Sequence, residues 1–385
     1  MNNDQPPLTL YVHWPWCLRK CAYCDFNSYP AMQPAEQDYL AAVLDDLDNE
    51  LALLAAPRVL QSVFIGGGTP SLISSAGVQT LLDGIRARAV LVADAEVTLE
   101  ANPGALSQAQ CAGYVAAGVN RLSFGVQSFS EHALRRLGRI HTPAQAVQAV
   151  QMARRAGCTN INIDLMYGLP GQTRRAARQD LKHALALAPE HIAYYQLTLE
   201  PQTPLGKAPP IDRAPEEQLA ALHDQGIATL TAAGYQHYEI SAYARPGQQC
   251  RHNLNYWHFG DYLGIGAGAH GKITDCTTGE VRRRVKHANP ARYITAAAHA
   301  RCALEQRLTA TERVLEFALN ALRLRHGVPM TLFAERTGLA SNAITAACAR
   351  AQAAGLLISD EQTLGATALG WRFLDDLLQY FVLEC

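Results

Sequence analysis

The sequence predicts an α/β protein built on a partial (β/α)6 TIM-like barrel, followed by a C-terminal α+β extension and a small winged-helix-like domain. Three observations lead to this prediction. The 385 residues, 49% hydrophobic and 17% charged, suffice for more than one typical domain and a large core. Short β-rich runs alternate with longer segments of helical period from residue 8 to about residue 201. Polar residues follow the ends of several of these strands, as in parallel barrels whose βα loops assemble a site.

Six strands and six helices are expected in the barrel. The strands are predicted at 8–13, 63–65, 96–100, 121–126, 160–165 and 192–198, and the helices at 35–55, 76–88, 107–117, 131–137, 143–156 and 173–188. Start and stop signals support several helices: Ser107 and Ser130 as N-caps, Pro143 in a first turn, and Gly118 and Gly157 at C-terminal ends. An open α/β sheet would show the same alternation, but the polar residues at the strand ends favour the barrel.

Two further parts are expected after the barrel, which we predict to cover residues 1–205. A proline-rich stretch at 201–215 marks this boundary. The extension, 206–305, is expected to contain a helix at 216–233, a strand at 238–242 and an aromatic, histidine-bearing loop at 251–271. The last part, 306–385, shows two amphipathic helices, a strand at 356–358 and a closing helix at 368–381, which is typical of a winged-helix-like module.

Charge and composition exclude several classes of function. Lys plus Arg number 33 and Asp plus Glu 34, so the net charge is −1 and no field attracts a polyanion. The candidate recognition helix at 341–354 carries one positive charge, Arg350, so we expect it to contact protein rather than nucleic acid. No basic, apolar leader is visible at the start, and the long uncharged stretch at 59–82 is broken by glycines and Pro70. We therefore expect a cytoplasmic protein with no integral membrane span.

Three of the ten cysteines, Cys17, Cys21 and Cys24, lie within eight residues, directly after the first predicted strand. Three thiolates on a short loop can bind three corners of a 4Fe-4S cluster and leave the fourth iron free for a small molecule, since clusters are ordinarily held by four cysteines. A zinc ion held by these thiolates and His13 is the alternative. The other cysteines are scattered and are expected to be small apolar residues or idle thiols: Cys111, Cys158, Cys250, Cys276, Cys302, Cys348 and Cys385.

The cysteine loop and the strand ends together resemble the radical S-adenosylmethionine (SAM) family, whose signature is this Cys-x3-Cys-x2-Cys loop followed by a glycine-rich turn after the second strand. Eight segments are similar to the subgroup that contains oxygen-independent coproporphyrinogen III oxidase and heme chaperones: 10–13, 24–28, 64–71, 100–104, 125–129, 137–139, 164–170 and 252–257. The resemblance covers nearly the whole chain. It implies a radical-SAM barrel, a 4Fe-4S cluster on Cys17, Cys21 and Cys24, bound SAM, and an electron donor.

The polar residues at the strand ends then become candidate SAM contacts. Glycines at 67 and 68 can let backbone approach the methionine end, because they lack a Cβ. Glu100 offers a bidentate acceptor for ribose hydroxyls, and Gln127, Arg139 and Asp164 can complete the polar contacts. The full set that the resemblance implies for SAM is Tyr11, Tyr23, Gly67, Gly68, Thr69, Glu100, Gln127, Arg139 and Asp164.

A polar and aromatic run, 252–257, is the candidate heme site. Aromatic faces can stack on a flat macrocycle, and imidazole is a common ligand of heme iron. The local sequence alone also fits a buried histidine bonded to backbone. The resemblance favours His252 as the heme ligand, with His258 and His270 in reserve.

Two features favour a heme chaperone over an oxidase within this subgroup. Oxidases carry a fourth cysteine two positions after the third, where this chain has Phe26, and a longer segment before the cluster than the sixteen residues here. We therefore expect a protein that binds heme, a 4Fe-4S cluster and SAM and passes heme to acceptor hemoproteins, respiratory ones among the candidates. The alternatives are oxidative decarboxylation of coproporphyrinogen III and a zinc-bound structural module.

Overall fold

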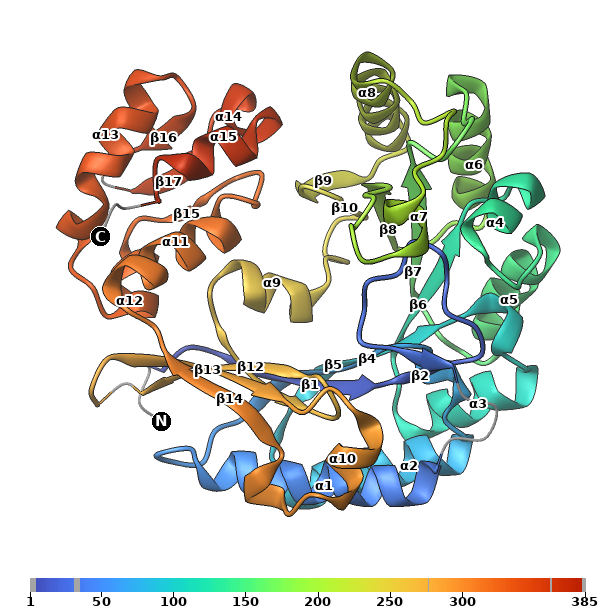
Figure 1. The fold of residues 1–385 in the computed structure, drawn as a ribbon, viewed down its shortest axis with the longest axis horizontal. Coiled ribbons are helices and arrows are strands. Elements are labelled where there is room, and N and C mark those ends of the chain that lie inside the picture. The colour runs from blue at the N-terminus through green and yellow to red at the C-terminus, as the bar shows by residue number, and fades with distance from the viewer. Residues whose placement is uncertain (1–4, 31–34, 276, 361, 383–385) are drawn as a thin grey trace.

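The computed structural model describes residues 5–30, 35–275, 277–360 and 362–382, and its centre is one twelve-stranded sheet in the order β14-β13-β12-β11-β1-β4-β5-β6-β7-β8-β10-β9 (Figure 1). The six predicted strands are confirmed, are neighbours in chain order and pair in parallel: β1 (Leu8–Trp14), β4 (Leu60–Gly67), β5 (Leu91–Ala101), β6 (Arg121–Gln127), β7 (Asn160–Tyr167) and β8 (His191–Gln196). Their carboxyl ends therefore share one rim, as the predicted partial barrel requires.

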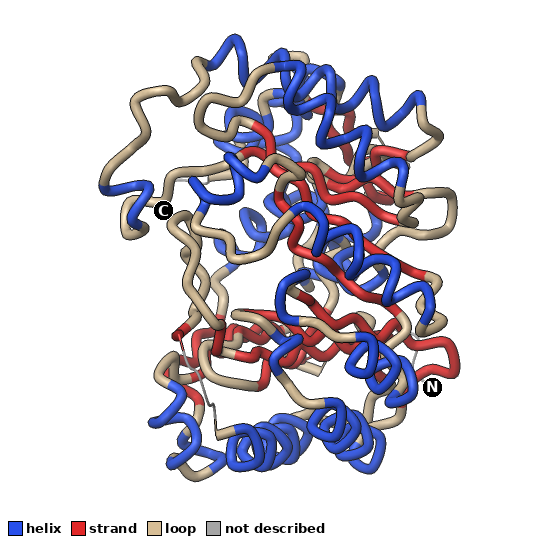
Figure 2. The backbone as a smooth tube through the Cα atoms, turned by 90° about the vertical axis from the view of Figure 1, so that its right-hand side faces the viewer, coloured by secondary structure: helices blue, strands red, loops and turns tan. Residues whose placement is uncertain are grey.

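The predicted barrel helices lie on the outer side of the curved sheet, and the strands lie inside them (Figures 1 and 2). They are α1 (Glu36–Ala52), α2 (Ser75–Arg88), α3 (Gln108–Ala117), α4 (Glu131–Leu137), α5 (Pro143–Arg155) and α6 (Arg174–Ala186). Ser107 forms a capping box with Gln110, Ser130 caps α4, and Gly118 ends α3 in the left-handed conformation. The local signals therefore set these boundaries.

The two edges of the sheet come from later parts of the chain. On one side β11 (Asp261–Ile265) runs parallel to β1, and β12 (His270–Asp275), β13 (Glu280–Lys286) and β14 (Cys302–Arg307) follow antiparallel. On the other side lie β10 (Ala242–Ala244) and β9 (Gln236–Glu239), so the single strand predicted at 238–242 is two strands. The sheet stays open, and α8 (Glu216–Ala232) is the predicted helix of the extension.

The prediction of a loop at 251–271 is wrong, because this segment contains helix α9 (Arg251–Trp257), β11 and the start of β12. Helix α9 lies on the inner side of the sheet, against β4, β1 and β11 (Figure 1). Its first residue has no local side-chain cap; instead Glu96 on β5 accepts hydrogen bonds from the backbone N–H groups of Arg251 (3.1 Å) and His252 (3.0 Å). Glu96 lies about 155 residues before the helix, yet it accepts from the free N–H groups at the start of α9. The sequence next to the helix therefore contains no sign of this cap.

Two buried lysines hold the edge strands in place, one by pairing with the barrel helix α1 and the other by pairing β12 with β11. Lys286 on β13 is 2.6 Å from an Asp46 carboxylate oxygen and 2.5 Å from Glu50, both on α1. Lys272 on β12 is 2.9 Å from Asp261 on β11. Both lysine side chains are 1% exposed. Buried charges are tolerated only when they are paired, so these ion pairs specify where the edge strands lie.

The C-terminal part forms a separate hydrophobic cluster, in which helices pack with a three-stranded sheet. Its first helices are α11 (Ala310–Ala321), α12 (Thr331–Thr337) and α13 (Thr345–Ala353), and the strands are β15 (Val328–Pro329), β16 (Leu357–Ser359) and β17 (Thr363–Ala366). The closing helix predicted at 368–381 is broken at Phe373 into α14 (Ala368–Arg372) and α15 (Leu374–Gln379). This composition agrees with the predicted winged-helix-like module.

Short elements complete the chain: β2 (Trp16–Cys17), β3 (Tyr29–Pro30), α7 (Pro204–Lys207) and α10 (Pro290–Thr295). None of the helices in the described ranges is long and apolar enough to cross a membrane. Of the scattered cysteines, Cys111, Cys158, Cys250 and Cys348 are buried and Cys302 is half-buried, all with free thiols. Cys276 and Cys385 lie outside the described residues.

Candidate functional site

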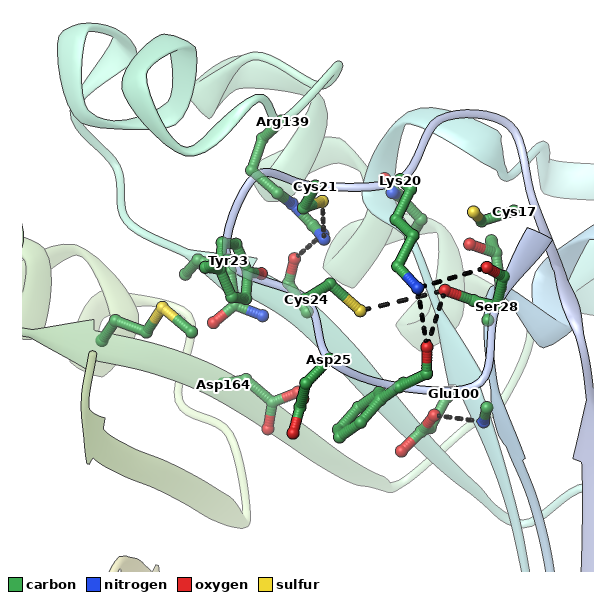
Figure 3. Close-up of a pocket in the computed structure, with 18 of the residues that line it drawn as sticks. Cys17, Lys20, Cys21, Tyr23, Cys24, Asp25, Ser28, Glu100, Arg139 and Asp164 are labelled. Carbon is green, nitrogen blue, oxygen red and sulfur yellow. Dashed lines mark hydrogen bonds between the residues drawn. The ribbon is translucent and has the colours of Figure 1, made fainter. Parts of the chain in front are cut away.

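A cavity of about 500 Å3 lies at the carboxyl-end rim of the parallel strands (Figure 3). The structure brings together around it most of the residues predicted from the sequence: Cys17, Cys21, Tyr23, Cys24, Gly67, Gly68, Thr69, Glu100, Gln127, Arg139 and Asp164. Tyr11 is on a neighbouring cavity and His252 lines neither. We call this cavity the thiol cavity.

The cysteine loop is held by contacts to two other segments. Ala22 donates its backbone N–H to the Leu137 carbonyl (3.1 Å) and accepts from the Leu205 N–H (2.9 Å). The Lys20 ammonium group closes the loop by donating to the Phe26 (2.9 Å) and Ser28 (3.3 Å) carbonyls. Figure 3 shows the three thiols along this loop, above Glu100 and Asp164.

The donor set fits an iron-sulfur cluster better than a single ion. In the described part of the chain, no three His, Cys, Asp or Glu side chains lie close enough to hold one metal ion, whereas a cube of four irons holds its thiolates farther apart. His13, the fourth ligand of the zinc alternative, has both ring nitrogens engaged, Nδ1 with the Tyr11 hydroxyl (2.9 Å) and Nε2 with the Asn27 carbonyl (2.8 Å). Burial raises the pKa of Cys17 and Cys24, so a bound cation is needed to hold them as thiolates.

The turn after β4 needs glycine at positions 67 and 68, because the neighbouring backbone leaves no room for a Cβ there. A Cβ on Gly67 would lie 2.6 Å from the Trp14 carbonyl oxygen, and one on Gly68 would lie 2.5 Å from that of Trp16. The N–H groups of Gly68 and Thr69 donate to these same two carbonyls, at 2.7 and 2.8 Å. The absence of a Cβ at these two glycines lets the turn pack closely against β1 and β2, which fixes it at the cavity wall. Their contact with the methionine end of SAM stays a prediction.

Besides Asp25 on the cysteine loop, two carboxyl groups line the thiol cavity, those of Glu100 and Asp164. Burial, and the proximity of Asp164, raise the pKa of Glu100 to about 7, and burial raises the pKa of Asp164 to about 6. Glu100 accepts a hydrogen bond from the Gly67 N–H at 3.1 Å, and Asp164 accepts one from the Asn162 amide at 2.7 Å. Each keeps acceptor capacity for hydroxyl donors in the cavity.

Arg139 and Gln127 also line the thiol cavity. Arg139 donates to the Cys21 sulfur at 3.6 Å and to the Gly125 carbonyl. Gln127 ends β6 with a φ of 68°, a conformation that non-glycine residues seldom adopt and that often marks a functional site. Its amide oxygen accepts from the Tyr195 hydroxyl at 2.7 Å. Tyr195 also lines the cavity, and the strand-end pattern would have found it, because it lies in the sixth predicted strand.

A second cavity of about 440 Å3 adjoins the first and shares Phe26, Gly67 and Glu100 with it. Aromatic side chains form much of its wall, and we call it the aromatic cavity. They include Tyr11, Tyr256, Trp257, Phe259 and Tyr262. The Tyr256 and Tyr262 rings meet edge to face with centroids 4.6 Å apart. The wall thus joins α9 to the edge strand β11.

His252 lies beneath this wall rather than in it. It is 1% exposed, its Nδ1 is 2.8 Å from the Ser62 hydroxyl, and its Nε2 is 2.9 Å from the Tyr256 hydroxyl. Burial lowers the pKa of His252 to about 3, so the ring is neutral. In this structure both ring nitrogens are occupied, and the visible role of His252 is to hold Tyr256 in the wall.

A chain of hydrogen bonds connects the two cavities through the sheet interior. Starting from Asp164 it passes, with links of 2.6 to 3.4 Å, through Asn162, His191, Tyr238, Cys250, Glu96 and His252 to Tyr256 in the wall of the aromatic cavity. Cys250 makes two of these links: its backbone N–H donates to the Tyr238 hydroxyl and its thiol donates to Glu96. The position of α9 is therefore tied to the strand that carries Asp164.

Two family models match the chain: the radical SAM superfamily over residues 11–184 and the HemN C-terminal domain over residues 308–373. The protein named heme chaperone HemW from Escherichia coli is 47% identical over 98% of this chain and 99% of its own length. HemW of Haemophilus influenzae is 44% identical over the same shares. Coproporphyrinogen III oxidase of Escherichia coli, a radical SAM enzyme, superposes with a TM-score of 0.83 at 24% identity, covering 98% of this chain and 90% of that one.

Proposed function

Because this chain belongs to the HemW family of radical SAM proteins, we propose that it is a heme chaperone that binds heme and passes it to acceptor hemoproteins. The radical SAM resemblance that the sequence motifs indicated is confirmed by these matches. The observation that carries the proposal is the 47% identity to a heme chaperone over 98% of this chain. The likeness to the oxidase, at 24% identity, supports the fold alone.

In this proposal the thiol cavity holds the radical SAM cofactors. Cys17, Cys21 and Cys24 would hold a 4Fe-4S cluster, which would provide the chemistry for one-electron reduction of bound SAM in the presence of an electron donor. Glu100 and Asp164 accept hydrogen bonds from SAM hydroxyl and amine groups, and Arg139 and Gln127 orient its charged end. The remaining proposed contacts are Tyr11, Tyr23, Gly67, Gly68 and Thr69.

The aromatic cavity supports the heme half of the proposal. A flat, apolar macrocycle is best held by aromatic faces with a few polar groups, and such faces line this cavity beside the thiol cavity. Phe26, at the position of the oxidases' fourth cysteine, is 59% exposed and lies on both cavities. A phenyl ring there offers a contact surface and no further ligand or thiol chemistry.

The test uses anaerobically reconstituted protein in two arms. In one, heme-loaded protein is mixed with an apo-hemoprotein, and heme transfer is followed from the acceptor's spectrum. In the other, reductant, SAM and coproporphyrinogen III are supplied and porphyrin products are analysed. The proposal predicts heme transfer without conversion of coproporphyrinogen. Robust formation of protoporphyrinogen, or failure to bind heme, would overturn it.

A further inference from the structure

Among the described residues that line the aromatic cavity, one histidine, His270, has a ring that is free to bind iron. His270, at the start of β12, lines the cavity, is exposed, and makes no side-chain hydrogen bond with any residue that the structure describes. His13 also lines the cavity, but both of its ring nitrogens are bonded. A metal ligand needs an imidazole nitrogen with a free lone pair, which His270 alone offers among the described residues of this wall.

The other two histidines considered from the sequence are less suited. His252 has both nitrogens bonded and is 1% exposed, so iron could reach it only if Tyr256 left the wall. His258 follows α9, does not line the cavity, and has its Nδ1 2.8 Å from the Leu254 carbonyl oxygen. Ligation by either one requires the wall to rearrange, whereas ligation by His270 does not.

The backbone holds His270 in a defined place. His270 pairs with Val285 across the β12–β13 hairpin. A Cβ on Gly264 of β11 would collide with the His270 carbonyl oxygen, so the absence of a side chain there lets β12 pack closely against β11. The imidazole therefore projects from a strand, which positions a ligand better than a loop does.

The chemistry of the remaining wall fits an iron tetrapyrrole with acidic side chains. Tyr256, Phe259 and Tyr262 provide aromatic contacts for the macrocycle. Arg283 lies over the Tyr262 ring at 5.7 Å and its side chain is 25% exposed. Its Nε and Nη2 donate to Glu316 and its Nη1 donates to the Tyr262 hydroxyl, which leaves a second Nη1 proton for a carboxylate. Lys272 is buried against Asp261.

We propose that heme binds in the aromatic cavity with the imidazole of His270 as its iron ligand and Arg283 at its propionate end. This inference rests on the proposed function and assigns the heme site within it. In this arrangement heme lies against the wall of the thiol cavity, at Phe26 and Gly67, without entering it. His252 is then a positioning residue that acts through Tyr256.

The test is an anaerobic titration of reconstituted full-length protein with heme, read from the visible absorption spectrum. His270→Gly is compared with His252→Ala and with a control, His299→Ala, on a short turn outside both cavities. We expect His270→Gly to weaken heme binding about tenfold or more, to lose the wild-type ligand-field bands, and to regain them when imidazole is added. His252→Ala should weaken binding while keeping those bands, and His299→Ala should behave as wild type.

Each outcome distinguishes the inference from the function on which it rests. If the wild type binds heme and His270→Gly keeps both its affinity and its spectrum, the ligand assignment is overturned while the chaperone proposal stands. Loss of the bands in His252→Ala with imidazole rescue there would move the ligand to His252. If the wild type itself binds no heme, the proposed function fails. Because His270 is exposed, the variant is expected to fold, and His270→Gln provides a second variant that keeps a polar side chain.

Discussion

The thiol cavity and the aromatic cavity share a wall but are assembled in different ways. The first is formed where consecutive parallel strands end, so its residues follow one another along the chain from Cys17 to Asp164. The second is lined by residues of β1, α9, the edge strands β11–β13 and α11. These elements are far apart in the sequence and meet only in the folded chain. A site at the ends of repeated βα units can be recognised from local patterns, whereas a site between edge elements depends on contacts that span the sequence.

The largest expected effect is loss of the iron-sulfur cluster from the thiol cavity. Cys24→Ser should remove most of the iron and sulfide from anaerobically prepared protein, because two thiolates cannot hold the cluster. Metal and sulfide analysis with visible absorption measures this. Cys302→Ser, a half-buried thiol on β14, is the matched control and should retain the cluster. A full complement of cluster in Cys24→Ser would remove the basis for the thiol cavity.

The second prediction concerns the ion pair behind the aromatic cavity. Lys272 donates to Asp261 and to the Phe259 carbonyl (3.0 Å), and Lys272→Met leaves Asp261 buried with Arg58 as its remaining cation among the described residues. We expect the free energy of unfolding to fall by about 3–5 kcal/mol, with weaker heme binding in the folded fraction. Urea unfolding and heme titration measure both quantities. The exposed Lys182→Met is the control, and a loss no greater than in that variant would contradict the prediction.

The third prediction uses the raised pKa of Glu100, about 7 against an ordinary 4.5. Between these values the carboxyl group ionises in the unfolded chain while it stays protonated in the fold. Its stabilising contribution is therefore complete below pH 4.5 and is lost as the pH rises through 7. Glu100→Gln has no such loss. In SAM-free protein, the free energy of unfolding of this variant should therefore rise relative to that of wild type by about 1–2 kcal/mol between pH 5 and pH 8. This figure is discounted for the partial exposure of Glu100.

Urea unfolding at both pH values checks this difference. Glu217→Gln, an exposed residue on α8, is the matched control and should show no pH-dependent gain. An equal offset between Glu100→Gln and wild type at pH 5 and pH 8 would show that burial does not raise the pKa of Glu100.

The smallest expected effect is at the shared wall. Phe26 is 59% exposed, so Phe26→Ala should change stability by about 0.5 kcal/mol or less. Because its ring faces the aromatic cavity, we expect heme affinity to fall by about two- to fivefold. Phe373→Ala, 47% exposed in the C-terminal part, is the control and should leave heme affinity unchanged. Equal affinities for the two variants would exclude Phe26 from the heme site.

The sequence predicted the barrel strands and the thiol cavity well because local rules determine them. Caps such as Ser107 fix helix starts, and strand ends carry Glu100, Gln127 and Asp164 to one rim. Arg139 could be assigned only through the family resemblance, since it follows a helix rather than a strand.

The aromatic cavity was harder to predict for identifiable physical reasons. The local sequence does not predict helix α9, because its cap, Glu96, comes from a distant strand. Strand β13 was missed because it is rich in arginine, and its charges become favourable only through partners such as Glu316 and Glu50 on other elements. His252 was preferred over His270 because local sequence does not report which imidazole has its nitrogens occupied.

The central claim is that the two cavities are separate binding sites, and a heme titration of the variant with Cys17, Cys21 and Cys24 all replaced by serine tests it most directly. The account predicts that this variant carries no iron-sulfur cluster yet binds heme with the wild-type spectrum and a Kd within about threefold of wild type. Loss of heme binding together with the cluster, in protein that remains folded, would contradict it.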